Sequence, residues 1–284
     1  MFKALSLLCG ACLCFFLSIQ LSYASGTDLV AKGSSWKYLD DGTDQSTAWQ
    51  ETGFDDSAWQ TGAAQLGYGD GDETTVVGYG PDSSNKYITT YFRKHFNLQR
   101  PQDYEKLECQ LLRDDGAVIY LNGTEVVRDN MPGGVIDYQT RAHGAGNTEG
   151  TFLTHELPLT ALVEGDNVIA VEVHQATPGS SDLSFDLGLA ITRLVDATHT
   201  FTFVEGSSLA TPIGQLNVYN PQADTITYNI QQAVPFVIDA NGKLFATSAL
   251  NQSLYQTYHF AVEVSNTNKT VTTGVSVTVI GINC

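Results

Sequence analysis

The fold class is decided by residues 113–127, which read RDDGAVIYLNGTEVV. Within this stretch Ala117, Ile119 and Leu121 alternate with other side chains, and a period of two is typical of a β-strand. Asn122-Gly123 comes next, a strong signal for a hairpin turn because both residue types tolerate positive φ. The β-branched residues that follow favour a return strand. The stretch therefore predicts a β-hairpin.

The same alternation of apolar residues recurs on the C-terminal side of this hairpin. Further stripes are Ile169, Val171 and Val173; Phe185, Leu187, Leu189 and Ile191; Phe201 and Phe203; Ile226, Tyr228 and Ile230; Phe260, Val262 and Val264; and Val275, Val277 and Val279. No long segment carries an apolar stripe with the period of a helix, and the one short helical candidate is Thr160–Val163. We therefore expect an all-β protein.

The strand pattern breaks between residues 193 and 200, around Asp196 and His199, and we place a domain boundary there. The first domain, residues 25–195, is the larger and is rich in loops. In the second, residues 199–284, strands follow one another about every 8–12 residues, which is the rhythm of a small β-sandwich. The sequence thus predicts two all-β domains.

The first 24 residues have the features of a secretory signal peptide. Lys3 provides a positive start, an apolar run follows over residues 4–21, and Ser22-Tyr23-Ala24 fits the cleavage site. An uncleaved anchor is the alternative, because the run is close to the minimum length that spans a bilayer. No later stretch is apolar enough to span one. We therefore expect a secreted mature chain that is not inserted in a membrane, located in the periplasm, outside the cell or at its surface.

The chain has 284 residues, with 14 Lys and Arg against 31 Asp and Glu, and a formal net charge of −17. This charge argues against nucleic acid as a partner, because phosphate binding requires a basic face. It is compatible with binding a cation. Three of the five cysteines fall in the signal peptide, which leaves Cys109 and Cys284. The sequence is compatible both with a bridge between these two and with two free thiols, Cys109 being buried.

Seven motifs follow one another in a specific order through the first domain. They are Trp36–Gly42, Gly53–Trp59, Ala64–Gly71, Tyr87–Arg93, Arg113–Gly123, Asn167–Gln175 and Ser184–Leu187. In this order the domain resembles the galactose-binding-like jelly-roll module found beside secreted bacterial metallophosphatases, lamin-tail proteins and glycosidases. The resemblance implies a β-sandwich of about eight strands. It implies an accessory module, in some cases for glycans, and it does not imply catalysis.

A second set of motifs runs through the C-terminal domain. They are Val204–Gly206, Thr211–Leu216, Thr227–Ile230, Phe236–Leu244, Ala249–Asn251 and Tyr258–Val264. Together they make residues 200–283 resemble a cadherin repeat. The fold class that follows is a jelly-roll β-sandwich followed by a smaller Greek-key β-sandwich of the cadherin and immunoglobulin type.

Cadherin repeats bind calcium through acidic residues at fixed motif positions, so the resemblance implies a ligand set. Its members here are Glu205, Asn220, Asn251 and Asn266, with Asp196 in the linker as the donor from the preceding domain. Most of these are neutral amides, whereas calcium prefers several carboxylates. The alternatives are a calcium site and a calcium-free sandwich that keeps only the packing pattern. Calcium is the one cofactor that the sequence suggests.

Four residues of the first domain are candidates for ligand binding. Trp49 lies in a loop-rich stretch, where its indole would stack on a sugar ring; core packing is the alternative. Asp114 and Asp115 are paired carboxylates, which can do acid–base work. Adjacent residues at a strand entry point to opposite sides, however, which favours a turn in which one of them accepts backbone N–H groups. His174 ends a strand, where it either lines the edge of the sandwich or has a structural role.

No set of catalytic residues can be assembled from the sequence. It lacks a His-Glu-x-x-His metal motif, a Gly-x-Ser-x-Gly elbow and a phosphate loop. We therefore expect a secreted, non-enzymatic binding or adhesion protein. Its jelly roll would contact a glycan or a cell-surface protein, and its second domain would be a spacer or protein contact. The alternatives are a calcium-binding, cadherin-type module for cell adhesion or self-association, and a hydrolase accessory protein.

Overall fold

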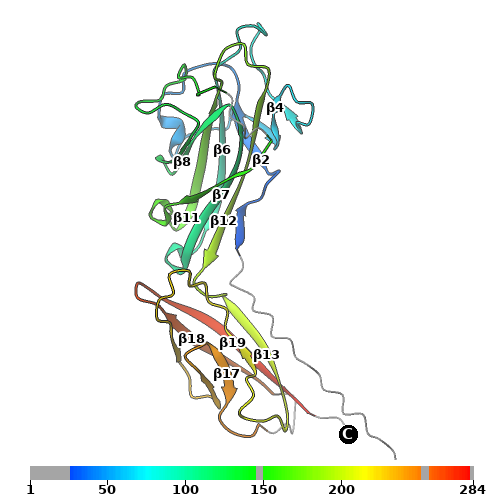
Figure 1. The fold of residues 1–284 in the computed structure, drawn as a ribbon, viewed down its shortest axis with the longest axis vertical. Helices are drawn as coiled ribbons and strands as arrows, with labels where there is room; N and C mark the ends of the chain where they lie inside the picture. Colours follow the sequence, from blue (N-terminus) through cyan, green and yellow to red (C-terminus); the bar gives the residue numbers. More distant parts are fainter. Residues whose placement is uncertain (1–25, 145–149, 251–255, 282–284) are drawn as a thin grey trace, which may run out of the picture.

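The computed structural model describes residues 26–144, 150–250 and 256–281, which form two β-sandwiches (Figure 1). The proposed signal peptide, residues 1–24, lies outside the described residues, as do Asn251 and Cys284. The described helical segments are the short 3-10 turns η1 (Ala48–Gln50), η2 (Pro101–Asp103) and η3 (Leu159–Ala161), the last of which overlaps the short helical candidate. None of them is long and apolar enough to cross a membrane. The all-β prediction is confirmed.

Two six-stranded sheets form the first sandwich. One has the order β10 (Leu153–Leu157), β7 (Tyr104–Asp114), β12 (Leu183–Arg193), β4 (Leu66–Tyr68), β5 (Thr75–Val76), with β1 (Thr27–Val30) also paired to β12. The other has the order β3 (Gln60–Ala63), β2 (Ser35–Leu39), β6 (Thr89–Leu98), β11 (Gly165–His174), β8 (Gly116–Leu121), β9 (Thr124–Asp129). Both sheets contribute to one apolar core, which includes Phe92 and Ile119 from the second sheet and Leu111 and Phe185 from the first.

The strand order is that of a jelly roll. The strands β4 and β6 to β12 divide into β4-β12-β7-β10 in one sheet and β6-β11-β8-β9 in the other. Counted along the chain, this is the order 1-8-3-6 against 2-7-4-5, the two-Greek-key arrangement of a jelly roll. The predicted hairpin is β8–β9, in which Leu121 pairs with Thr124 across Asn122 and Gly123. Both turn residues have positive φ, as their types favour.

The central strands of the second sheet of the jelly roll, β6, β11 and β8, are mostly buried on both faces. All six residues of β8 are buried, although strand geometry turns alternate residues away from the core. On the outer face Trp49, Trp59, Tyr91 and Tyr120 belong to a second apolar cluster, which we call the outer cluster. Its remaining members include Met131 and Ala142, so loops before β3 and after β9 cover this face. These loops continue to the end of the sandwich where the candidate site lies.

In the described residues of the second sandwich there are seven strands. One sheet has the order β13 (Thr198–Val204), β19 (Thr270–Ile280), β18 (Gln256–Ser265), β15 (Thr227–Ile230), with β13 parallel to β19. The other has the order β14 (Gly214–Gln215), β17 (Lys243–Ala246), β16 (Phe236–Ile238). This division of strands β13, β15, β18 and β19 into one sheet and β14, β16 and β17 into the other makes the Greek-key sandwich that the sequence predicts.

The two sandwiches join without a free linker (Figure 1). β12 ends at Arg193, and the next two residues, Leu194 and Val195, are fully buried in the core of the second sandwich. The Leu194 N–H donates to the carbonyl oxygen of Asp103, and the Tyr219 N–H donates to that of Leu194. The segment that the sequence analysis treats as a boundary is therefore packed against both sandwiches.

Candidate ligand-binding site

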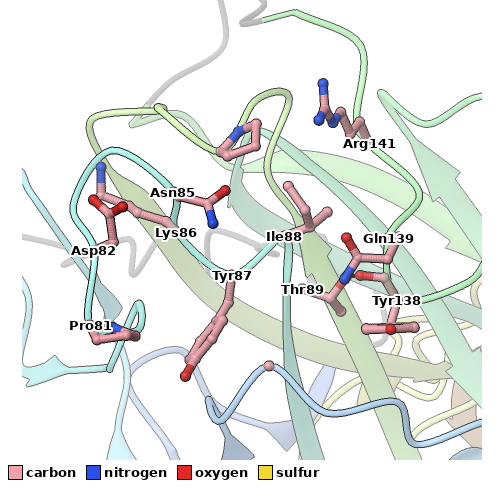
Figure 2. Close-up of a pocket in the computed structure, with 12 residues that line it drawn as sticks. Pro81, Asp82, Asn85, Lys86, Tyr87, Ile88, Thr89, Tyr138, Gln139 and Arg141 are labelled. Atoms are coloured by element: carbon pink, nitrogen blue, oxygen red, sulfur yellow. Dashed lines mark hydrogen bonds between the residues drawn. The ribbon is translucent and has the colours of Figure 1, made fainter.

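A cavity of about 400 Å³ lies among the loops at the end of the jelly roll that is remote from the second sandwich. The strand β6 shows this, because it begins at Thr89 beside the cavity and runs toward η2, which lies where the two sandwiches join. Residues 81–88 form one wall and residues 138–141 the other, with Thr89 between them (Figure 2). Gly42 and Pro178 complete the lining.

Backbone hydrogen bonds hold the first wall in place. The Lys86 N–H donates to the carbonyl oxygen of Pro178, and the Tyr87 N–H donates to that of Tyr79. Gly42 has φ +75°, and a Cβ at this position would overlap the ring of Tyr87. A glycine is therefore needed at 42, both for its left-handed backbone and for the space that the Tyr87 ring occupies.

Buried polar groups under the cavity hold the second wall. His174, which is fully buried at the end of β11, places Nδ1 2.7 Å from the carbonyl oxygen of Thr140. Because a carbonyl only accepts, Nδ1 carries the hydrogen. Thr89 donates its hydroxyl to the carbonyl oxygen of Tyr138 at 2.9 Å. On the same wall, hydrogen bonds from Gln139 and Thr140 lower the pKa of Asp137.

Several side chains on the cavity wall have unused hydrogen-bonding groups. Among the described residues, the side-chain amides of Asn85 and Gln139 and the guanidinium of Arg141 have no hydrogen-bond partner, although each lines the cavity. The rings of Tyr87 and Tyr138 stand on opposite walls (Figure 2). The cavity thus combines aromatic surface with free donors and acceptors, which suits a small polar ligand that has apolar faces.

Of the residues that the sequence analysis proposed for ligand binding, His174 and Asp115 support the cavity without lining it. Asp115 is buried, and its carboxylate accepts from the Ala176 N–H at 2.8 Å and the Ser180 hydroxyl at 2.9 Å. Asp115 therefore fixes the loop that carries Pro178. The backbone N–H that Asp115 accepts comes from Ala176, 61 residues along the chain, so the contact is a tertiary one and not the local turn that the sequence suggested. Asp114, at the end of β7, is also buried.

Trp49 is 1% exposed and lies in the outer cluster, so the structure corrects the proposal that its indole stacks on a sugar. Its ring packs against those of Tyr91 and Tyr120, with centroids 4.8 Å and 5.7 Å away. Its carbonyl oxygen accepts from the buried guanidinium of Arg93. Burial also raises the pKa of both tyrosines. The loop containing Trp49 is therefore a cover for the sheet, and its aromatic residue faces inward.

The five residues proposed as calcium ligands do not meet in one place. Asn266 precedes β19, whereas Glu205 donates its N–H to the carbonyl oxygen of Ile280 at the other end of that strand. The 11 residues of β19 separate them by about 30 Å. Asp196 and Asn220 lie near the junction, and Asn251 is outside the described residues.

The oxygen atoms near the junction already have protein partners. The side-chain oxygen of Asn266 accepts from the backbone N–H groups of Asn268 and Lys269, and that of Asn220 accepts from Asp224. Lys269 lies 3.3 Å from Glu105 of the first sandwich, so a cation already occupies the junction. No group of three or more His, Cys, Asp or Glu suited to a metal occurs among the described residues. The proposed residues therefore do not fit a cadherin-type calcium ion.

Sequence reasoning missed Tyr87, Tyr138, Asn85 and Arg141. Tyr87 stands in a motif that predicts a strand, and the other three lie in loops without periodicity. The two walls are separated by about 50 residues, and only the end of β6 brings them together. The one sequence feature that could have indicated this site is the aromatic and amide side chains in the stretch before Thr89.

No family model and no curated protein matches the chain. Among solved structures, it is similar to Bacteroides uniformis β-glucuronidase 2, with TM-score 0.42 and 15% identity, over 90% of this chain and 26% of that chain. It is also similar to human protocadherin-24 EC1-2, with TM-score 0.25 and 22% identity, over 28% of this chain and 40% of that chain. The third cadherin domain of human protocadherin 7 gives TM-score 0.28 and 18% identity, over 30% of this chain and 82% of that chain. The chain spans about a quarter of the length of the glucuronidase that it matches.

Proposed function

We propose that this chain is a secreted, non-enzymatic binding protein that holds a glycan in the loop cavity of its jelly roll. The observation that carries the proposal is the convergence of two tyrosine rings and two free side-chain amides in one cavity of about 400 Å³. A sugar ring offers apolar C–H faces to aromatic rings and hydroxyl groups to amides, so this combination matches it. The volume is suited to one or two sugar units.

The buried groups beneath the cavity support the same proposal. His174 and Asp115 each hold a different loop of the lining through buried hydrogen bonds. Residues fixed in this way need little ordering when a ligand binds, which favours affinity. The second sandwich, whose core includes Leu194 and Val195 of the connecting segment, would serve as a spacer or as a contact for another protein.

The proposal is tested with the mature chain on a glycan array, followed by calorimetry on the best ligand. We expect Gln139→Ala to weaken binding about fivefold, because a hydrogen bond in a binding site contributes roughly 1 kcal/mol. Gln222→Ala is the matched control, since Gln222 is exposed on the second sandwich. Binding that is unaffected by Gln139→Ala would place the ligand elsewhere.

Two other results would change the proposed function. If the array shows no glycan binding and the chain instead captures a cell-surface protein, the cavity is not a sugar site. Turnover of phosphate esters or glycosides by the purified chain, lost in a cavity variant, would replace the binding function with an enzymatic one.

A further inference from the structure

Arg141 stands out among the cations of this acidic chain. The chain carries 31 acidic residues against 14 Lys and Arg, so an arginine side chain readily finds a carboxylate. Five of the six arginines do so: Arg93, Arg100, Arg113, Arg128 and Arg193 each lie within 4.0 Å of one. Within the described residues Arg141 has neither an ion pair nor a hydrogen bond, and it lines the cavity.

The acidic residues on the same two loops are engaged in local turns. Asp137 accepts from the Gln139 N–H and the Thr140 hydroxyl, and Asp82 accepts from the Ser84 N–H. Across the cavity, Lys86 donates to the carbonyl oxygens of Ser83 and Ser180 and has no carboxylate within 4.0 Å among the described residues. Within the part of the chain that the structure describes, neither Arg141 nor Lys86 therefore has a carboxylate within 4.0 Å.

We propose that the ligand is an acidic glycan, whose uronic acid carboxylate binds the guanidinium of Arg141 while the ring lies between Tyr87 and Tyr138. The inference rests on the proposed glycan-binding function and specifies its substrate class. A planar guanidinium offers two parallel N–H donors, which match the two oxygens of a carboxylate. Lys86 adds a second positive charge on the opposite wall. An uncharged sugar would leave Arg141 without a partner.

The test compares ligands that share a sugar backbone but differ in whether the carboxyl group is free or methyl-esterified. Calorimetry with the mature chain measures binding of an oligogalacturonate and of its fully methyl-esterified form, with a sulfated galactan oligosaccharide as a third probe. We expect the free acid to bind about tenfold more tightly than the ester, because a charge-assisted bidentate contact is lost in the ester. The preference should decline as salt is added, since Arg141 is exposed.

Variants of Arg141 separate the charge from its geometry. Arg141→Gln should weaken binding of the acid to about the level of the ester, and Arg141→Lys should retain part of the preference for the acid. Lys243→Gln removes an unpaired charge from the second sandwich and is the matched control. Circular dichroism confirms that each variant is folded.

The outcomes distinguish this inference from the proposed function. Equal binding of acid and ester by the wild-type chain would contradict the inference that the ligand is acidic, but it would leave the proposed glycan-binding function standing. Stronger binding of the sulfated oligosaccharide than of the free acid would contradict the proposal that the recognised group is a carboxylate. Absence of binding to all three probes and to every glycan of the array would overturn both proposals.

Discussion

The ammonium group of Lys269, in the turn between β18 and β19, lies 3.3 Å from a carboxylate oxygen of Glu105 on β7. The same ammonium donates to the carbonyl oxygen of Tyr104, and Asn266 donates its amide to Glu105 at 3.3 Å. The turn between β18 and β19 of the second sandwich is thus bonded to Tyr104 and Glu105, the first residues of β7. Lysine here bridges two sandwiches, a task that a metal ion performs between cadherin repeats.

Lys269→Met should therefore weaken the junction between the sandwiches. The variant leaves Glu105 with one donor and removes a hydrogen bond to the Tyr104 carbonyl. We expect a loss of about 1 kcal/mol in the free energy of unfolding, since the group is partly exposed. Urea denaturation measures it, with Lys243→Met, remote from the junction, as the control.

Calcium provides a check on the same interpretation. Because Lys269 supplies the positive charge, we expect the melting temperature to be equal in millimolar calcium and in chelator. A calcium-stabilised wild-type chain, with a rise of a few degrees, would contradict it, since saturating ligand stabilises the state that binds it.

Arg93 should contribute strongly to stability. It is fully buried, donates to Asp56 at 2.9 Å and holds the carbonyl oxygens of Trp49 and Glu51. Arg93→Ala would remove the donor to the Trp49 carbonyl oxygen and to the Asp56 carboxylate, and would leave the Glu51 carbonyl oxygen with only the Phe54 N–H. It would thereby detach the cover of the outer cluster. We expect a loss of about 3 kcal/mol in the free energy of unfolding, measured in urea.

Arg100→Ala is the matched control for that experiment. Its side chain is 52% exposed, and its partner Asp103 keeps a second arginine, Arg193. An exposed ion pair contributes less than about 1 kcal/mol. Equal losses for the two variants would show that burial of Arg93 has no special role.

His199 should make the chain less stable in acid. Its Nε2 accepts from the Asn217 N–H at 3.2 Å, and its Nδ1 lies 3.1 Å from the hydroxyl of Thr273. Burial lowers the pKa of His199, an effect that Asp196 partly opposes. The unfolded chain therefore binds a proton at a higher pH than the folded chain does, so stability falls as pH drops through about 6.5.

Urea denaturation between pH 7.5 and pH 5 measures this effect, the range being chosen around the ordinary histidine pKa of about 6.5. His199→Gln should reduce the dependence of stability on pH, whatever it does to stability at neutral pH. His259→Gln, at an exposed site on β18, is the control. An unchanged pH dependence in His199→Gln would contradict the expectation.

Cys109 should not react with thiol reagents in the folded chain. It is fully buried in the jelly-roll core, and burial raises its pKa to about 12. Thiolate, the reactive form, is therefore nearly absent at neutral pH. A chromogenic disulfide reagent should label Cys109 only after denaturation. Labelling that requires a reductant as well would indicate a bridge to Cys284.

The fold was predictable because its signals are local. The hairpin at Asn122-Gly123 follows from two residue types that tolerate positive φ, and the flanking strands follow from alternation over a few residues. The candidate site was not predictable in this way. Trp49 stands in a loop-rich stretch that suggests exposure, yet β6, β8 and β11 need a cover and Trp49 provides it.

Two all-β units in this order follow from local sequence alone, since strand periodicity and turn chemistry act between neighbouring residues. Tertiary contacts were needed to show that Tyr87 and Arg141 share a cavity, that His174 and Asp115 lie beneath it, and that Lys269 closes the junction. These contacts join residues that are distant along the chain. Their formation depends on the jelly-roll topology, which determines which ends of strands become neighbours. No local sequence pattern specifies that topology.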